Sequence, residues 1–294
     1  NTKHYDMVPI IDHNNLEESI SHLTQMEPDD KVKLAVSLMK SVNAVRPYSM
    51  AFSGGKDSVV MAWMAVEAGL TVPKVYNNTT IDPEGTISFC QKHGCRISRN
   101  DESFLDLVER KGFPTMFRRF CCKELKERYI SDYLFVGIRR DESVKRSARY
   151  TCFEDSFAYS SKVVTSRFMP LLFFSDSDIS YVVNKHDLEM HPLYYDHQHH
   201  FCVERRLGCI GCPLQGDRGK LDYLRYPKLL KQVIERGVKF HENHGRTRHD
   251  AYLNIVYNLF YSNGGYEKYQ QTYEGLFDTD PREILNEYFF LNLP

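Results

Sequence analysis

The chain has 294 residues, of which 42% are hydrophobic and 26% are charged, as in an ordinary globular protein. A formal net charge of −1 does not point to a nucleic-acid or membrane partner, although local patches of charge could still exist. No run approaches the ~20 apolar residues of a membrane helix, and the polar start lacks a hydrophobic signal segment. We therefore expect a cytoplasmic protein with no membrane partner.

Hydrophobic spacing predicts strands that alternate with helices in the first half of the chain. Helices are expected over 15–45 and a short strand over 48–52, followed by a helix over 59–68. Further elements are expected at a strand over 72–76, a helix from Asp82 to Gly94 and a strand over 133–137. This alternation favours a doubly wound, mostly parallel sheet with helices on both faces, which is an α/β fold.

The periodic signal weakens after about residue 150. Helices are expected over 179–185 and 226–244, and the aromatic-rich stretch 250–294 is expected to be helical and to cap the sheet. We therefore expect the whole chain to be divided into three segments: an N-terminal helical segment over 1–45, a central domain over 46–225 and a helical C-terminal extension over 226–294.

A Gly-containing loop, Ser-Gly-Gly-Lys-Asp-Ser over residues 53–58, joins an expected strand to an expected helix. Gly54 and Gly55 have no Cβ, so their backbone can approach an anion closely. The N–H groups and the dipole at the start of the following helix favour negative charge, as in a phosphate site. The other members offer hydroxyl donors, a cation, and a carboxylate that orients the loop or holds Mg²⁺; they are Ser53, Ser58, Lys56 and Asp57.

This loop matches neither the Walker nor the Rossmann fingerprint. It resembles the PP-loop of the ATP-pyrophosphatase superfamily. The resemblance implies a fold of the adenine nucleotide α-hydrolase type, which binds ATP or adenylyl sulfate and cuts ATP between the α and β phosphates. The alternative is an ordinary strand-to-helix turn that happens to contain two glycines.

Four of the eight cysteines form two close pairs, Cys121-Cys122 and Cys209 with Cys212. Four thiolates in two pairs suit an iron–sulfur cluster or a tetrahedral zinc site. Adjacent cysteines are unusual ligands because their side chains diverge. The second pair lies in a Gly-Cys-Ile-Gly-Cys-Pro turn, which can wrap backbone N–H groups around sulfur. Buried thiols without a metal are the alternative.

The two pairs resemble the cluster ligands of the phosphoadenosine phosphosulfate (PAPS) reductase family. The likeness is to its adenylyl-sulfate-reducing branch and to related sulfur-transfer enzymes, which carry a [4Fe–4S] cluster. The resemblance covers roughly residues 40–240 and favours iron over zinc. It implies four ligands in the central domain: Cys121, Cys122, Cys209 and Cys212.

A basic segment, Gly-Ile-Arg-Arg-Asp-Glu-Ser over residues 137–143, follows an expected strand, where an open α/β sheet places ligand-binding loops. Arginine binds phosphate or sulfate through paired N–H donors. The segment resembles the family's Gly-x-Arg-x-x-x-Ser substrate loop, which implies that Arg139, Ser143 and Arg146 contact the substrate. A solvated basic turn is the alternative.

Three other places give weaker indications. Thr79 and Thr80 could line the nucleotide site, although helix capping explains the following Asp82-Pro83-Glu84 equally well. The histidine-rich segment His186–His200, which includes the histidines over 197–200, is better explained as an exposed loop than as a metal site. Four basic residues could stabilise an anionic cluster or substrate, or could be plain surface charge: Arg118, Arg119, Lys123 and Lys126.

A reductase of this family also uses a nucleophilic cysteine in a C-terminal Glu-Cys-Gly-type tail, and no cysteine follows Cys212 here. The first hypothesis is therefore ATP-dependent adenylation coupled to sulfur transfer, as in DNA phosphorothioation proteins. The loop would hold Mg-ATP, pyrophosphate would leave, and sulfur would replace the adenylylated oxygen. The catalytic candidates are Lys56, Asp57, Arg139 and Arg146.

Two alternatives stay open. One is an adenylyl sulfate or PAPS reductase whose nucleophile is Cys202, Cys152 or a partner chain's cysteine. The other is a non-catalytic regulator that senses a nucleotide. The expected partners are an adenine nucleotide, a sulfur donor (a cysteine desulfurase or a thiol carrier), a nucleic-acid acceptor and a second copy of the chain.

Overall fold

The computed structural model describes residues 16–142, 152–158, 163–261 and 280–294. The chain forms two compact units, each assembled from separate stretches of sequence. The sheet unit comprises Asn1–Tyr76, Gly85–Ser98 and Tyr129–Leu207, and the helical unit comprises Asn77–Glu84, Arg99–Arg128 and Gly208–Pro294. The division into three successive segments stays a prediction.

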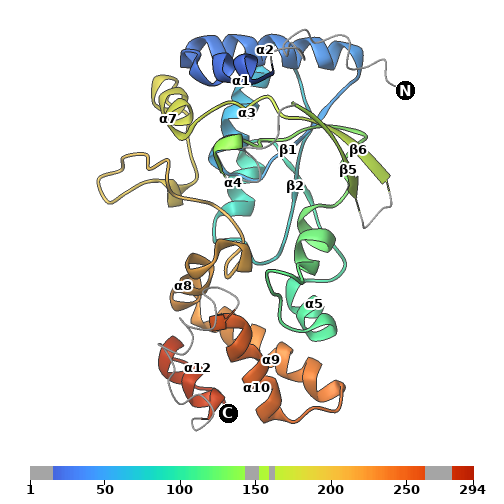
Figure 1. The fold of residues 1–294 in the computed structure, drawn as a ribbon, viewed down its shortest axis with the longest axis vertical. Coiled ribbons are helices and arrows are strands. Elements are labelled where there is room, and N and C mark those ends of the chain that lie inside the picture. The colour runs from blue at the N-terminus through green and yellow to red at the C-terminus, as the bar shows by residue number, and fades with distance from the viewer. Residues whose placement is uncertain (1–15, 143–151, 159–162, 262–279) are drawn as a thin grey trace. The chain divides into compact units, whose positions relative to one another are not determined.

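The sheet unit is built on six strands in the order β3-β2-β1-β4-β6-β5 (Figure 1). β1 pairs in parallel with β2 and β4, and β4 pairs in parallel with β6. β5 pairs antiparallel with β6. The mostly parallel sheet with flanking helices confirms the expected α/β class. The strands are β1 (Ser49–Ala51), β2 (Lys74–Asn77), β3 (Arg96–Ser98), β4 (Tyr133–Phe135), β5 (Phe153–Ala158) and β6 (Val163–Phe168).

Helices α2, α3 and α7 pack on one another in the sheet unit. Pro28 begins α2 at a position where its missing N–H costs nothing, and Ala35, Met39 and Val42 form the buried face. Met50, Met61, Phe135 and Phe168 belong to the core of this unit. The helices of the unit are α1 (Leu16–Gln25), α2 (Pro28–Val45), α3 (Lys56–Glu67), α4 (Thr86–Lys92) and α7 (Asp176–Lys185).

Three predicted helix starts were wrong by a few residues, and one of them is that of α3, which was expected from residue 59 and begins at Lys56. The helix expected from Asp82 begins at Thr86, because Gly85 takes a left-handed conformation at its N-cap. The helix expected over 179–185 begins at Asp176, because the Ser175 hydroxyl accepts a hydrogen bond from the Asp178 N–H in a capping box. The sequence reading also missed β3 and the β5–β6 hairpin.

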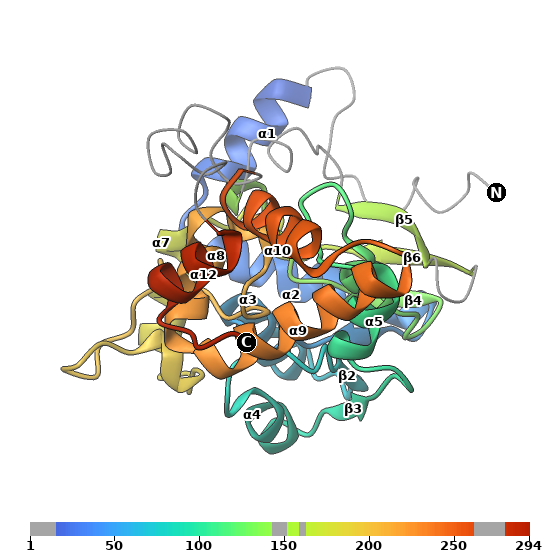
Figure 2. The same ribbon diagram turned by 90° about the horizontal axis from the view of Figure 1, so that it is seen from below.

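The helical unit surrounds a second core, to which Leu107, Leu230, Ile255 and Leu285 contribute fully buried side chains. α9 packs against both α5 and α10, and α10 packs against α12, as Figure 2 shows for α9 and α10. The helix expected over 226–244 is confirmed, and α5 was missed. The helices of this unit are α5 (Phe104–Lys111), α8 (Asp217–Arg225), α9 (Pro227–Asn243), α10 (Arg248–Val256) and α12 (Pro281–Phe289).

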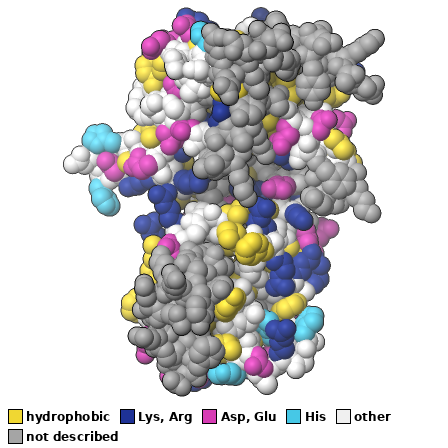
Figure 3. Space-filling view, in the orientation of Figure 1, with side chains coloured by type: hydrophobic (Ala, Val, Ile, Leu, Met, Phe, Trp, Pro, Cys, Tyr) yellow, Lys and Arg dark blue, Asp and Glu magenta, His cyan; other side chains and the backbone are white. Residues whose placement is uncertain are grey.

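Charged side chains of both signs are interspersed over the visible surface (Figure 3). Many of them pair: Lys92 Nζ lies 2.6 Å from Glu189 Oε2, and Arg110 Nη2 lies 2.7 Å from Glu102 Oε2. Of the helices that the structure describes, none combines the length and the apolar character needed to cross a membrane.

Candidate functional site

The phosphate loop lies at the carboxyl end of the central strand β1 and leads directly into α3, as the sequence predicted. Gly54 has φ of +75°, and a Cβ there would lie 3.3 Å from the Leu207 side chain, so glycine suits both the conformation and the space. Ser58 Oγ donates to the Gly55 carbonyl at 2.7 Å. The Gly55 N–H donates to Ser53 Oγ at 3.3 Å, so the loop is held by its own side chains.

Three predicted catalytic or binding residues meet in one charge network behind this loop. Arg139 donates from Nε to Asp57 Oδ1 and from Nη2 to Asp176 Oδ1, both at 2.6 Å. Its Nη1 donates to the Phe174 carbonyl at 3.2 Å, and its side chain is 2% exposed. The Lys56 ammonium lies 3.6 Å from Asp176 Oδ1. Arg139 therefore ties Asp57 to the start of α7.

Asp176 was missed by the sequence reading, because it stands in a helix start that capping alone explains. Its N–H donates to Asp141 Oδ2 at 3.0 Å, which links α7 to the short helical turn Arg140–Glu142. The two remaining substrate-loop predictions, Ser143 and Arg146, lie outside the described residues. The role of Arg139 in substrate contact stays a prediction.

Tyr194 is a second residue that the sequence reading missed. Its hydroxyl oxygen accepts the Lys56 N–H at 3.1 Å and the Leu207 N–H at 3.2 Å. The side chain is buried, and burial raises the pKa of its phenol. Tyr194 thus fastens the chain up to Leu207 onto the start of α3. No motif marked it, because it lies within the His-rich segment His186–His200, which was expected to be an exposed loop.

All four predicted metal ligands belong to the helical unit. A hydrogen bond between the neighbouring thiols raises the pKa of Cys121, with burial adding to the effect, and lowers the pKa of Cys122. Burial raises the pKa of Cys209 to about 12 and also raises that of Cys212. The charges of Cys209 and Cys212 act on Cys121, so the two pairs lie within electrostatic reach of one another.

Two glycines permit the backbone turn that carries the second cysteine pair. Gly211 has φ of +69°, and a Cβ there would lie 2.0 Å from the Tyr223 ring. A Cβ on Gly219 would lie 2.2 Å from the Cys212 carbonyl oxygen. A side chain at either position would force the turn and α8 apart, so packing requires glycine both within the turn, at Gly211, and in α8, at Gly219.

The donor set suits a thiophilic metal, although its atoms are not arranged as a closed ligand shell. Across the described ranges, no three Cys, His, Asp or Glu side chains form a group that could hold one ion. The Lys126 ammonium acts electrostatically on Cys209, Cys122 and Cys212, and would offset the charge of thiolate ligands. The four cysteines fit an iron–sulfur cluster chemically, and their role as ligands stays a prediction.

Thr79 and Thr80 also lie in the helical unit, beside the cysteines. Thr79 Oγ1 donates to Asp82 Oδ2 at 2.6 Å and accepts from Cys209 Sγ at 3.5 Å. Thr80 Oγ1 accepts the Phe104 N–H at 2.8 Å and so caps α5. Both hydroxyls are used in folding this unit, and their part in nucleotide binding stays a prediction.

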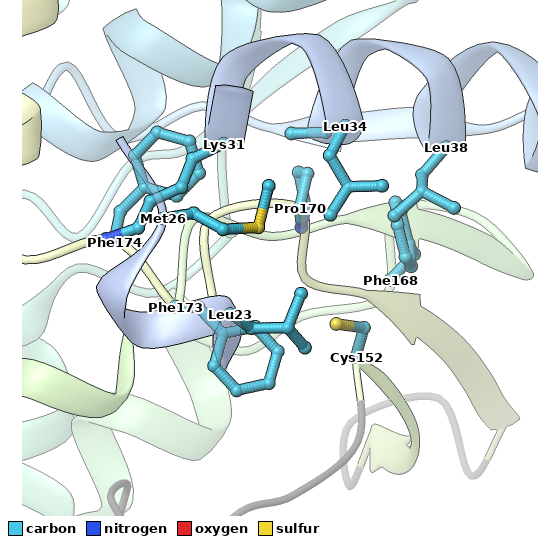
Figure 4. Close-up of a pocket in the computed structure, with 11 residues that line it drawn as sticks. Leu23, Met26, Lys31, Leu34, Leu38, Cys152, Phe168, Pro170, Phe173 and Phe174 are labelled. Atoms are coloured by element: carbon cyan, nitrogen blue, oxygen red, sulfur yellow. The ribbon is translucent and has the colours of Figure 1, made fainter. Parts of the chain in front are cut away.

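A small apolar pocket in the sheet unit offers no alternative active site. Figure 4 shows its lining from α1, α2 and the chain after β6, with Leu23, Leu34 and Phe173 among the labelled side chains. Its one charged member, Lys31, donates to Asp178 Oδ2 at 2.7 Å. The pocket holds no converging set of polar groups that could bind and turn over a nucleotide.

Residues 47–215 match the family described as phosphoadenosine phosphosulfate reductase domain, which is more than half of the chain. The protein belongs to this family. The match takes in the phosphate loop, the Arg139 network and all four candidate ligand cysteines. Membership of the family was expected from the motifs and is confirmed.

Individual relatives are more distant. "Uncharacterized protein MJ0066" of Methanocaldococcus jannaschii is 26% identical over 246 residues, which cover 75% of this chain and 48% of that protein. The chain thus spans about half the length of the curated relatives it matches.

Among solved structures, the phosphoadenylyl-sulfate (PAPS) reductase from Candida auris is similar at a TM-score of 0.37 and 12% identity, over 61% of this chain and 89% of that chain. The U34-tRNA thiolase NcsA from Methanococcus maripaludis, with its [4Fe–4S] cluster, is similar at 0.32 and 17% identity, over 66% and 71%. Because both TM-scores are low, neither likeness adds to the family assignment.

Proposed function

We propose that this protein uses ATP to adenylylate an acceptor and couples that step to sulfur transfer, with Cys121, Cys122, Cys209 and Cys212 as ligands of a [4Fe–4S] cluster. The observation that carries the proposal is the phosphate loop with its buried Lys56, held by the Arg139 network at the start of α3. Zinc in place of the cluster is the alternative that the same thiols allow.

The first step follows from the charges around the loop. Lys56 and the N-terminus of α3 would bind the phosphates of ATP, and Asp57, whose Oδ1 bonds Arg139, would offer Oδ2 to Mg²⁺. An acceptor oxygen attacks the α-phosphorus and forms a new P–O bond. The bridging bond to the β-phosphate breaks, and pyrophosphate leaves with the electron pair. The positive charge of Lys56, the α3 N-terminus and Mg²⁺ around the phosphates would stabilise this transition state.

Sulfur then replaces the activated oxygen. A sulfur nucleophile at the oxidation level of hydrosulfide forms the new bond, and AMP leaves with the former acceptor oxygen, so no electrons are gained or lost overall. A cysteine desulfurase or a thiol carrier would supply the sulfur; where it arrives as a persulfide, a second thiol would attack the inner sulfur, form a disulfide and release the outer sulfur as hydrosulfide. A [4Fe–4S] cluster bound at the four cysteines would supply a site that holds or relays it.

The surroundings of the first cysteine pair favour nucleic acid as the acceptor. Residues 110–128 carry seven Lys or Arg and two Glu, in a chain whose net charge is −1. In this segment the Phe117 side chain is 89% exposed, next to Arg118 and Arg119. Exposed aromatic rings among basic residues stack on unpaired bases while the cations contact phosphates. Figure 3 shows Lys and Arg side chains gathered over α5, where this segment begins.

Burial disfavours one of the candidate nucleophilic cysteines of the reductase alternative. Burial raises the pKa of Cys152 to about 12, so this thiol is almost entirely protonated at neutral pH. Cys202 is less buried, and its Sγ lies 3.5 Å from the His200 carbonyl oxygen. Cys202 or a partner chain's cysteine is therefore favoured over Cys152 for that reaction.

The test is anaerobic purification followed by iron and sulfide analysis and a pyrophosphate assay. We expect about four irons and four sulfides per chain, and pyrophosphate release from ATP that an RNA or DNA acceptor stimulates and Lys56→Met abolishes. Sulfite release from adenylyl sulfate with a thiol would select the reductase instead. Nucleotide binding without turnover would select the regulator.

A further inference from the structure

The hydroxyl of Tyr194 accepts hydrogen bonds but donates none within the described residues. Its oxygen accepts two backbone N–H groups, from Lys56 at 3.1 Å and from Leu207 at 3.2 Å. A phenol oxygen can accept two hydrogen bonds and donate one. Among the described residues, none accepts the proton of this hydroxyl. Since the side chain is only 2% exposed, water has little access to it, and a buried donor without an acceptor is unfavourable.

The position of this hydroxyl matters because Lys56 is the first residue of α3. The Lys56 N–H that it accepts is one of the groups that face an anion at a helix N-terminus. A Cβ on Gly55 would lie 3.5 Å from Tyr194 Oη, and a Cβ on Gly54 would lie 3.3 Å from Leu207. The hydroxyl therefore lies against Gly55 of the phosphate loop, where a bound phosphate would be in reach.

We propose that Tyr194 is a further nucleotide-binding residue, whose hydroxyl donates its proton to a phosphate oxygen on the loop while its oxygen holds Lys56 and Leu207. The inference rests on the proposed function, because it needs a phosphate at this loop. It identifies a neutral donor, contributed from outside the motif, that is anchored by two backbone bonds before the ligand arrives. Such a pre-positioned donor binds without losing rotamer freedom.

Two roles of the hydroxyl have to be separated. In the first it only accepts, and Tyr194 is a latch that holds the chain at Leu207 to the loop. In the second it also donates to phosphate. The charged groups that act on it are Asp57 and Arg206, which have opposite effects, and burial keeps its pKa above the ordinary value. The donor is thus present across the neutral pH range.

The first experiment compares Tyr194→Phe with Tyr195→Phe in the full chain. Tyr195 Oη accepts the Met190 N–H at 3.1 Å, so its loss removes the same kind of bond away from the loop. We expect both variants to unfold at lower temperature without ligand. Only Tyr194→Phe should weaken the binding of ATP and of pyrophosphate, by about 10-fold or more, as for a bond to a charged group. Equal affinity of the wild type and Tyr194→Phe for ATP and pyrophosphate would overturn this inference but not the proposed function.

The second experiment places a fluorinated tyrosine, which ionises at lower pH, at position 194. Its phenolate still accepts both N–H bonds but has no proton to donate. ATP affinity should then fall as the pH rises through the new pKa, while the wild type stays flat in that range. A flat profile for the fluorinated protein would leave Tyr194 as a latch and refute the donor role. If the wild type binds neither ATP nor pyrophosphate, the proposed function itself fails.

Discussion

The phosphate loop of the sheet unit and the cysteine group of the helical unit differ in how complete they are. Around the loop, Arg139 bonds two carboxylates and a carbonyl, and the loop serines bond its own backbone. The four cysteines share only one thiol–thiol hydrogen bond that acts on their pKa values, and burial raises the pKa of Cys209 and Cys212. The loop is pre-organised by protein contacts, whereas thiol ligands are drawn together and deprotonated by the metal that they bind.

This difference implies that the two sites respond to different changes. A site held by ion pairs fails when one charge is removed, because the partners are left uncompensated. A site that a metal would organise fails when one ligand is removed, while the surrounding fold persists. Variants in each unit can therefore be compared through two readouts, nucleotide affinity and bound iron.

The largest effect is expected from Cys209→Ser. Serine is a poor ligand for iron, so the bound iron should fall about 10-fold or more, as when a metal site loses a ligand or its support. ATP affinity should stay close to that of the wild type, since the phosphate loop lies in the other unit. Iron analysis and calorimetry measure the two quantities. Cys95→Ser, in the sheet unit, is the matched control and should keep its iron; retention of iron in Cys209→Ser would refute the ligand assignment.

The next largest effect is expected from Arg139→Met. The guanidinium is almost fully buried, and its loss takes the bonded cation away from Asp57 and leaves Asp176 with Lys56 alone, at a cost of about 3 kcal/mol of unfolding free energy. Half of the Asp176 side chain is exposed, which keeps the expected cost at the lower end of the range. Urea unfolding measures it, and the iron content should not change. Lys185→Met removes the exposed ion pair with Asp29 and should leave stability nearly unaltered.

Much of the sheet unit could be predicted because local signals and tertiary packing agree there. The loop Ser-Gly-Gly-Lys-Asp-Ser combines a strand, two glycines and a helix start, and the structure has this order. The short strand β4 was found because its residues are apolar and buried. β5 and β6 were missed, because both mix polar with apolar residues and β6 is only partly buried.

The contacts that build the candidate site were harder to predict. Tyr194 and Asp176 reach the loop across long stretches of chain, and neither belongs to a motif. Arg139 was singled out for substrate contact, which stays a prediction, and its three bonds within the protein could not be inferred from its sequence neighbours. Sequence spacing marks a residue type suited to a task, whereas the partners of a buried charge depend on tertiary structure.

A smaller effect is expected from Gly211→Ala in the turn between Cys209 and Cys212. Alanine would bring strain at φ of +69° and a clash with the Tyr223 ring, which together cost about 2 kcal/mol. Gly245 also has positive φ, of +74°, but a Cβ there meets nothing within 4 Å. Gly245→Ala should therefore cost only about 1 kcal/mol, for the conformation alone. Equal losses in urea unfolding would contradict the packing argument. The iron content should fall in Gly211→Ala only.

The smallest effect concerns His241 in the core of the helical unit. Burial, with the charges of Arg246, Arg118 and His244, lowers its pKa, while a hydrogen bond between Nε2 and Asn254 Oδ1 at 3.2 Å opposes the shift. The unfolded chain therefore binds a proton more readily than the folded one below about pH 6.5, and stability should decline as the pH falls through that value. His241→Gln lacks this proton and should lose less stability between pH 7.5 and 5.5 in urea unfolding. An identical pH dependence in both proteins would mean that groups other than His241 account for the loss of stability. The acid sensitivity of the helical unit, which contains the four cysteines, would then not depend on His241.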